Sequence, residues 1–406
     1  MSGVLIMNNR LVKKAISDLK KGKLILVVDD QDREAEGDFL GLAECATSET
    51  LNMMVTYGRG LVCAPMAQSV AERLNLDLMT AHNTESFKTA FTISVDHKTT
   101  TTGISAFDRA KTITSLCDPD SKPDDFEHPG HIFPLIAEKG GVLKRQGHTE
   151  AAVDLAFMAD SEPVAYICET LNADGTMARL PQLKEIAQQL DLTLITIQEI
   201  IAYRYSLNQK AVTAIDPVKM PTKEGDFSLT GYVSTTDDQT QLLLGKGVLS
   251  SEQPLLLRLH SECFTGDILG SKRCDCGEQL HKSMQKIQEE GRGAVLYLRQ
   301  EGRGIGLLNK LKAYKLQENG YDTYDANTKL GFAPDERSYG IAAAILCDQK
   351  IKRVRLMTNN PAKVKALTEY GIEVVEQVPL ETEPQAENIK YLRTKKDKFH
   401  HALHLI

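Results

Sequence analysis

The chain has no tryptophan, and only 6% of its 406 residues are aromatic. No apolar run approaches the length of about 18 residues that reads as a membrane-spanning helix. The N-terminus lacks a long apolar segment after a basic start, so we expect no secretory signal. These absences predict a cytoplasmic globular protein with no membrane partner.

An excess of positive charge is also missing. The chain carries 48 Lys and Arg residues against 55 Asp and Glu residues, for a formal net charge of -7. Because a general nucleic-acid binder needs a basic face, this composition argues against nucleic acid as a partner. Anionic small molecules would have to be held by local clusters of Arg and Lys. The length is ample for about two or three domains with cores of their own.

Strand and helix patterns alternate along the chain, which predicts α/β structure. Helices are expected at 8–20, 47–57, 66–74, 150–159, 181–190, 197–205, 277–290, 305–318, 338–348 and 362–370. Strands are expected at 24–30, 89–96, 165–171, 255–260, 293–300 and 352–358. The pattern lapses over 206–226, which holds Pro217, Pro221 and Gly225. We therefore place the joint near 206–213, between domains 1–206 and 207–406.

Three of the eight cysteines, Cys263, Cys274 and Cys276, lie in the run RLHSECFTGDILGSKRCDCGEQL. A Cys-x-Cys pair is more typical of metal binding than of a disulfide in a reducing compartment. Three thiols without a close fourth predict a catalytic zinc site with one open position, which could activate water for attack on an electron-poor carbon. His260 and His281 flank the run, so a closed structural Cys3His site is the alternative.

An acidic run, VVDDQDREAEGDF, follows the first expected strand. It places six carboxylates around the single Arg33, namely those of Asp29, Asp30, Asp32, Glu34, Glu36 and Asp38. Oxygen ligands suit Mg2+, which shares its coordination shell with substrate oxygens. The alternative is a solvated acidic loop.

Two further segments of the first half carry imidazoles and a basic group. HPGHIF contains His128 and His131, and GGVLKRQGHTEAAVDL presents Arg145, His148 and Thr149 just before a helix. A helix N-terminus with an Arg and a hydroxyl can hold phosphate, although an ordinary capped helix would look the same. Together with Glu169 on an expected strand, these groups favour proton-transfer chemistry on a sugar phosphate.

The first half resembles 3,4-dihydroxy-2-butanone 4-phosphate synthase, and the second half resembles GTP cyclohydrolase II. The first resemblance rests on DDQDREAEGD, GRGLVCAPM, TAFTISVD, TTTGISAFDRA, PGHIFPL, RQGHTEAAVDL and CETLNADGTMARLP. The second rests on RLHSECFTGD, KRCDCGEQL, RQEGRGIGLLNKLKAY, YDT, LGFAPDER and TNNPAKV. The whole chain is thus similar to the bifunctional enzymes of riboflavin biosynthesis. The resemblance implies an α+β first domain, an α/β second domain and a homodimer.

For the first half, the resemblance implies conversion of D-ribulose 5-phosphate to 3,4-dihydroxy-2-butanone 4-phosphate and formate. Glu34 and His148 match ligands of Mg2+ or Mn2+, and His131 and Glu169 match catalytic positions. The positions that match substrate contacts are Arg33, Glu34, Asp38, Arg145, Gln146, Gly147, His148, Thr149 and Glu169. One departure is Gln146, where the family usually has a small residue; we expect its side chain to point away from the substrate.

For the second half, the resemblance implies hydrolysis of GTP to a diaminopyrimidinone phosphoribosyl product, formate and pyrophosphate. Cys263, Cys274 and Cys276 match zinc ligands, which favours the open site. The positions that match GTP contacts are Arg258, Leu259, His260, Ser261, Glu262, Gln279, Glu301, Gly302, Arg303, Thr323, Thr358 and Lys363. Asp335 matches a proton acceptor and Arg337 a nucleophile, although a protonated Arg would serve equally to stabilise charge.

Two alternatives remain at this level. The second half could be a zinc-stabilised binding module without catalysis. Alternatively, one half alone could be active while the other serves for dimerisation. Of the remaining cysteines, Cys45, Cys117, Cys168 and Cys347 lie in apolar runs and are expected to be inert, whereas Cys63 lies in a segment near the expected sugar site.

Overall fold

The computed structural model describes residues 2–29, 33–206, 211–234, 239–250 and 252–406. Asp30 and Asp32 of the acidic run and residues 207–210 of the predicted joint lie outside the described residues. The chain divides into two compact units, one of residues 6–203 and one of residues 204–406 with the first few residues of the chain. The division at residues 206 and 207 stays a prediction.

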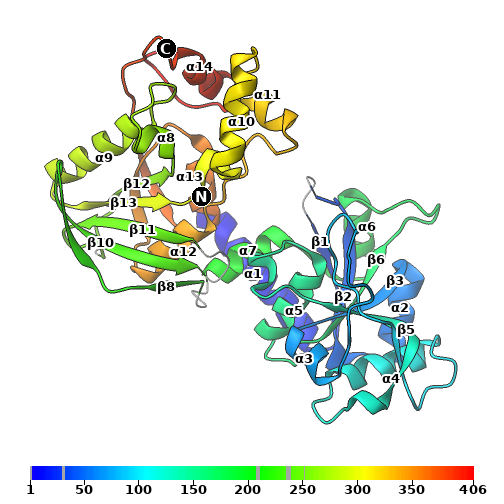
Figure 1. Ribbon diagram of the computed structural model, residues 1–406. Helices are drawn as coiled ribbons and strands as arrows, with labels where there is room; N and C mark the ends of the chain where they lie inside the picture. Colours follow the sequence, from blue (N-terminus) through cyan, green and yellow to red (C-terminus); the bar gives the residue numbers. More distant parts are fainter. Residues whose placement is uncertain (1, 30–32, 207–210, 235–238, 251) are drawn as a thin grey trace. The chain divides into compact units, whose positions relative to one another are not determined.

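The first unit is built on a seven-stranded mixed sheet (Figure 1). Its strands are β1 Ile25–Val28, β2 Gly37–Leu42, β3 Arg59–Met66, β4 Val95–His97, β5 Phe126–Ile136, β6 Ala165–Thr170 and β7 Thr193–Thr196, in the order β4-β5-β3-β6-β2-β1-β7. Its helices are α1 Ser2–Lys20, α2 Ser48–Tyr57, α3 Gln68–Arg73, α4 Ala106–Cys117, α5 His148–Met158, α6 Leu180–Gln189 and α7 Ile197–Ser206. The last residues of α7, from Arg204 on, belong to the second unit. The sheet is mixed, because it contains antiparallel pairs, such as β2 with β6, as well as parallel pairs, such as β3 with β5. With its helices, this unit is an α+β domain.

The two faces of this sheet have different roles. Phe39 of β2 and Cys168 of β6 belong to one apolar cluster with residues of α2, α4 and α6. Because successive side chains of a strand alternate between faces, the neighbouring Asp38 and Glu169 lie on the opposite face. Helix α5 packs across β2, β3 and β6. Alternation therefore gathers polar groups on the face opposite the apolar cluster.

The second unit contains an eight-stranded sheet. Its strands are β8 Val212–Ala214, β9 Val218–Thr222, β10 Gly225–Ser234, β11 Thr240–Lys246, β12 Leu255–Ser261, β13 Gly293–Leu298, β14 Arg353–Met357 and β15 Glu373–Val378. The order is β15-β14-β12-β13-β11-β10-β8, and β9 pairs with β10. The helices are α8 Phe264–Asp267, α9 Cys276–Glu290, α10 Gly306–Glu318, α11 Thr323–Lys329, α12 Gly340–Asp348, α13 Pro361–Glu369 and α14 Ile389–Asp397.

Strands β15, β14, β12 and β13 are parallel, whereas β11, β10 and β8 continue the sheet antiparallel. Leu256, Val295 and Met357, one from each of β12, β13 and β14, pack in a core with Met284 and Ile287 of α9. The carboxyl ends of the parallel strands open at one edge of the sheet, the usual place for a ligand in an α/β sheet. The segments that follow β12, β13 and β14 thus start from a common edge.

The predicted fold class, an α+β domain followed by an α/β domain, is confirmed. Two local predictions differ from the structure. Of the strand expected over 89–96, only its end belongs to β4, and Phe91 and Thr92 form isolated bridges. The stretch 206–226 contains β8 and β9, and Pro221 is tolerated because β9 pairs on one side with β10. No helix in the described part of the chain is both long and apolar enough to span a membrane.

Candidate active sites

The acidic run of the first unit folds around Asp29. The Asp29 carboxylate accepts backbone hydrogen bonds from Glu34 and Glu36, at 3.2 and 2.8 Å, and pairs with Arg33 at 2.9 Å. Asp29, Glu34 and His148 each offer a ligand atom, and these atoms lie within 4.8 Å of one another. Burial raises the pKa of Glu34, against the lowering effect of Arg33. The arrangement fits a hard cation, and Asp29 lies beside the two predicted ligands.

His148 reaches this cluster as the first residue of α5. Its ring is buried, and Nε2 lies 3.2 Å from the carbonyl oxygen of Val27. Burial lowers the pKa of His148, so the ring is neutral at physiological pH. A neutral ring that donates from Nε2 keeps its Nδ1 lone pair for a metal, the usual arrangement of a ligating histidine.

Asp38 and Glu169 face each other across β2 and β6. Burial, and then the negative charges of Glu169 and Glu34, raise the pKa of Asp38 well above its ordinary value. The Glu169 carboxylate accepts a hydrogen bond of 2.7 Å from the backbone of Leu61. A Cβ at Gly60 would lie 2.5 Å from that same carboxylate, so glycine makes room for it. Asp38 can thus hold a proton within the site.

His131 of β5 has a partner that the sequence did not indicate. Its Nδ1 lies 2.7 Å from the carboxylate of Asp96, which also accepts the backbone N–H of His131 at 2.9 Å. A Cβ at Gly103 would lie 1.9 Å from Asp96, so the loop around Gly103 covers this pair closely. Asp96 fixes the orientation of the imidazole and leaves Nε2 for proton transfer.

The expected phosphate cradle begins with Gly147 as the N-cap of α5. Arg145 pairs with Glu150 at 2.6 Å and donates to Thr89 at 2.9 Å. Thr149 is buried in the first helical turn. Gln146 is exposed, and its side chain accepts a hydrogen bond of 3.0 Å from Gln198.

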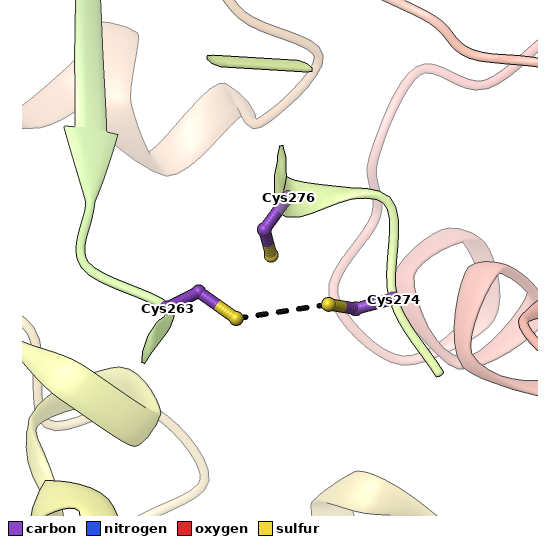
Figure 2. Close-up of side chains that lie close together, drawn as sticks. All are labelled: Cys263, Cys274 and Cys276. Carbon is purple, nitrogen blue, oxygen red and sulfur yellow. Dashed lines mark hydrogen bonds between the residues drawn. The ribbon is translucent and has the colours of Figure 1, made fainter. Parts of the chain in front are cut away.

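The cysteine cluster of the second unit joins two segments. Cys263 follows β12, whereas Cys274 and Cys276 flank the N-cap of α9, and the three sulfur atoms point toward one another (Figure 2). The sulfur atoms lie within 4.8 Å of one another, and those of Cys263 and Cys274 are 3.6 Å apart. Two thiolates that bind zinc tetrahedrally at about 2.3 Å stand about 3.8 Å apart. The geometry fits zinc.

The surroundings also fit a metal. A Cβ at Gly266 would lie 2.9 Å from the sulfur of Cys274 and 3.1 Å from that of Cys263, so a side chain there would intrude on the cluster. Lys310 lies 3.1 Å from the sulfur of Cys263. Contacts with Cys274 and Cys276, and then with Lys310, hold the pKa of Cys263 well below its usual range. The cluster thus favours a thiolate.

The two histidines that could have closed the site have other partners. The ring of His260 is buried, with Nε2 at 3.1 Å from the Asp267 carboxylate. His281 is exposed, and its Nδ1 lies 2.7 Å from Glu224. In the described residues the three cysteines group without either histidine. This arrangement favours the open site.

A single cavity contains the cysteines and most of the predicted GTP contacts. The predicted residues that line it are Arg258, His260, Ser261, Glu262, Gln279, Glu301, Gly302, Arg303, Thr323, Arg337, Thr358 and Lys363. Leu259 is not among the described lining residues, and its carbonyl accepts a hydrogen bond of 2.7 Å from Lys363, which is one of them. Burial, and then the charges of Arg258 and Arg337, hold the pKa of Lys363 well below its usual value. An anion in the cavity would relieve this crowding of positive charge.

Arg337 lines the cavity and forms an ion pair with Asp335, which is not among the described lining residues. The guanidinium Nε lies 2.8 Å from the Asp335 carboxylate. Burial opposes the charge of each, but the pairing lowers the pKa of Asp335, and Tyr339 and Asp335 keep the pKa of Arg337 above its ordinary value. Arg337 is therefore a permanent cation.

The turn EGRG after β13 depends on left-handed backbone. Gly302 and Arg303 have φ of 64° and 63°, and the Glu301 carboxylate accepts the backbone N–H groups of Gly302 and Phe264 at 2.7 and 2.6 Å. Glu301 also pairs with Lys310 at 2.7 Å. The turn thus presents Arg303 to the cavity while Glu301 ties it to the cysteine loop.

Sequence reasoning missed several lining residues, namely Arg273, Lys310, Asn327, Asn359, Asn360, Tyr391, Lys395 and His401. Tyr314 also lines the cavity, and its hydroxyl lies 3.1 Å from that of Thr265. A signal was available for Lys310, four residues before Tyr314 and on the same helical face. Lys395 and His401 carry no motif.

Two family models match the chain. The model of 3,4-dihydroxy-2-butanone 4-phosphate synthase matches residues 13–203, and that of GTP cyclohydrolase II matches residues 213–379. The first is a lyase family and the second a hydrolase family, so the chain is an enzyme of two catalytic families.

Whole-length relatives share both parts. The "Riboflavin biosynthesis protein RibBA" of Bacillus cereus is 55% identical over 97% of this chain and 99% of that protein. The protein of the same name from Bacillus mycoides matches at 55% identity with the same coverage. The chain therefore belongs to the family of two-domain proteins that join a 3,4-dihydroxy-2-butanone 4-phosphate synthase to a GTP cyclohydrolase II.

A solved structure is similar to this chain over most of its length. It is RibBX, described as a two domain 3,4-dihydroxy-2-butanone 4-phosphate synthase from A. baumannii. The TM-score is 0.69 at 32% identity, over 90% of this chain and 98% of that chain. Its description names the synthase activity alone.

Proposed function

We propose that both halves are catalytic: the first converts D-ribulose 5-phosphate to 3,4-dihydroxy-2-butanone 4-phosphate and formate, and the second hydrolyses GTP with release of formate and pyrophosphate. Both reactions would serve riboflavin biosynthesis, as the name of the Bacillus relatives indicates. The observation that carries the proposal is one cavity that joins a three-thiol cluster to seven cationic side chains. These are Arg258, Arg273, Arg303, Lys310, Arg337, Lys363 and Lys395.

In the first half, we assign Glu34 and His148 as the ligands of Mg2+ or Mn2+, with Asp29 next to them. The bound cation would stabilise negative charge as it develops on the substrate oxygens. Asp38 holds a proton within the site because burial and Glu169 raise its pKa. His131, oriented by Asp96 at 2.7 Å, gives or takes a proton through Nε2.

In the second half, we assign Cys263, Cys274 and Cys276 as the zinc ligands. The bound zinc would activate water for attack on the electron-poor carbon of the guanine ring. The cations of the cavity hold the triphosphate, whose charge they match. Arg337 stabilises the charge at the α-phosphate and does not act as a nucleophile, because its guanidinium stays protonated beside Asp335.

The A. baumannii description favours a second candidate, in which the synthase half alone is active. In that case the second half would be a binding module or a dimerisation platform. The two candidates differ in one measurement, since a non-catalytic module releases neither formate nor pyrophosphate from GTP.

The test is to measure formate from each substrate separately with the metal-loaded full chain, and pyrophosphate from GTP alongside. We expect formate from both substrates and equal amounts of formate and pyrophosphate from GTP. Formate from ribulose 5-phosphate alone would establish the second candidate. The homodimer stays a prediction, which sedimentation of the full chain would check.

A further inference from the structure

The last residues of the chain form one wall of the GTP cavity. The cyclohydrolase family model ends at residue 379, so the segment 385–406 lies beyond it. This segment contains α14, and it contributes Tyr391, Lys395 and His401 to the cavity lining. Helices α10, α11 and α14 lie together at one end of the second unit (Figure 1).

Two ion-pair groups hold the segment in place. Lys395 lies 2.5 Å from the carboxylate of Asp275, the residue between Cys274 and Cys276 in the sequence, and both partners are buried. Lys398 lies 2.6 Å from Asp322 and 3.0 Å from Asp325. The segment is therefore fastened to the cysteine loop on one side and to α11 on the other.

After α14 the chain turns back over the cavity. The backbone N–H of His401 donates to the carbonyl of Lys395 at 3.0 Å, and that of Ala402 donates to the carbonyl of Asn359 at 2.8 Å. Asn359 itself lines the cavity. The guanidinium of Arg303 lies over the Phe399 ring, with its Cζ atom 3.7 Å from the ring centroid. These contacts of Phe399, His401 and Ala402 hold the backbone of His401 in place.

The Nε2 atom of His401 is buried and has no hydrogen-bonding partner among the described residues. The same holds, within that part of the chain, for Nη1 of Arg303 and Nε of Arg258, which line the same cavity. A buried polar atom without a partner is costly, and native proteins keep few of them. Three such atoms from three separate segments point to a polar ligand in the cavity.

The charges around His401 define that ligand further. The positive charges that act on its ring are those of Lys395, Arg303, Arg337 and Lys363. Burial, and then these charges, lower the pKa of His401 to about 2, so the ring is neutral and carries one N–H donor. An N–H group surrounded by cations suits an anionic oxygen, and phosphate is the anion that GTP offers.

We propose that the segment 385–406 is part of the GTP site and that His401 donates a hydrogen bond from Nε2 to a phosphate oxygen of the nucleotide. The inference rests on the proposed cyclohydrolase function. Lys395 has a positioning role, because its pairing with Asp275 holds α14 against the cysteine loop.

The test compares three variants of the metal-loaded full chain. His401→Ala removes the donor, and His401→Gln places an amide N–H near the position of Nε2. His404→Ala is the matched control, because His404 is an exposed histidine of the same tail whose side chain does not line the cavity. The measurements are KM and kcat for GTP, and inhibition by inorganic triphosphate and by guanosine.

For His401→Ala we expect KM for GTP to rise about 10- to 100-fold, as for loss of a hydrogen bond to a charged group, with kcat changed less than about 3-fold. Inhibition by triphosphate should weaken by a similar factor, and inhibition by guanosine should stay unchanged. His401→Gln should recover most of the loss, and His404→Ala should match the wild type. Zinc content, thermal unfolding and ribulose 5-phosphate turnover report whether each variant is folded. If the His401→Ala variant does not fold, the kinetics of the His401→Gln variant test the role of His401.

Two outcomes overturn the inference alone. In the first, the wild type hydrolyses GTP, and the His401→Ala variant is folded and keeps the same KM for GTP and the same inhibition by triphosphate. The other is an equal loss of guanosine inhibition, which would place His401 at the base and not at a phosphate. A wild type that releases no formate from GTP would instead refute the proposed function.

Discussion

The two candidate sites differ most in the sign of their charge. The site of the first unit gathers Asp29, Glu34, Asp38 and Glu169 around a buried, neutral His148. The cavity of the second unit is lined by seven cationic side chains and, among the described lining residues, by the two carboxylates of Glu262 and Glu301. Both proposed substrates are phosphate anions, so the two units meet the same charge in opposite ways.

Because the two sites differ in charge, we expect the two metals to have different roles. A sugar phosphate can approach a group of carboxylates only when a cation offsets their charge, so Mg2+ would be needed for binding as well as for chemistry. The second cavity carries its own countercharges, so zinc would be needed for the chemistry while the nucleotide binds without it. Three predictions test this contrast directly.

The largest expected effect is that of Cys274→Ser on GTP hydrolysis. Loss of one of three thiolates should lower zinc content and reduce formate release from GTP by more than about 100-fold, because even outer partners of a metal ligand cost 10- to 100-fold. Ribulose 5-phosphate turnover should be unchanged and serves as the internal control. Normal formate release from GTP by this variant would remove the zinc assignment.

Glu34→Ala is the matching change in the first unit. It removes a predicted ligand, so ribulose 5-phosphate turnover should fall by more than about 100-fold while GTP hydrolysis continues. Glu36→Ala is a suitable control, since Glu36 contacts Asp29 through its backbone N–H, which the substitution keeps. Near-normal activity of Glu34→Ala at sub-saturating Mg2+ would mean that the acidic run is only a solvated loop.

Chelation should separate binding from chemistry in the two units. After metal removal, we expect the full chain to bind GTP within about 3-fold of the metal-loaded affinity, because the cations of the cavity remain. Binding of ribulose 5-phosphate should be lost. Isothermal titration with each ligand measures both quantities, and restored Mg2+ or Zn2+ controls for damage. Loss of GTP binding together with zinc would contradict the proposed contrast in charge.

The sequence predicted the parts of each site that are contiguous motifs. The carboxylates after β1 and the thiols around Asp275 can be read from spacing, because the metal requires those ligand types close together. Asp96 was not predictable as the partner of His131, because β4 and β5 bring together residues 35 positions apart. Lys395 and His401 were missed for the same reason, since only the docking of α14 on the cysteine loop brings them to the cavity.

The secondary structure was likewise predictable only where the sequence has a clear periodic pattern. Strands and helices with clear periodicity, such as β13 and α9, were found near their observed bounds. Helix α4 was missed, although Ser105 caps its N-terminus. Its buried residues include Thr112 and Ser115 as well as Ile113, so burial there does not follow an apolar pattern. The helical structure of such a segment depends on tertiary packing, which the local sequence pattern does not show.

The smallest effect concerns the joint between the units. Tyr205 is buried within the second unit, with its ring 5.4 Å from that of Tyr370 and in contact with Gly340 at the start of α12, where a Cβ would lie 2.1 Å from the ring. A fragment of residues 207–406 lacks this aromatic, whereas a fragment of residues 204–406 keeps it. Each metal-loaded fragment should still hydrolyse GTP within a few-fold of the full chain, because every described residue lining the cavity lies between 258 and 401.

The fragments should differ in stability. Loss of a buried aromatic costs about 3–5 kcal/mol, which lowers the Tm of a unit of this size by roughly 6–20 °C. The 204–406 fragment with Tyr205→Ala should unfold like the 207–406 fragment, which separates loss of the ring from loss of chain length. Fragment 1–206 should keep ribulose 5-phosphate turnover, measured as formate release. Two metal-loaded fragments that are inactive alone and recover on mixing would show that the units depend on each other, and the contrast between their sites would then describe one shared assembly.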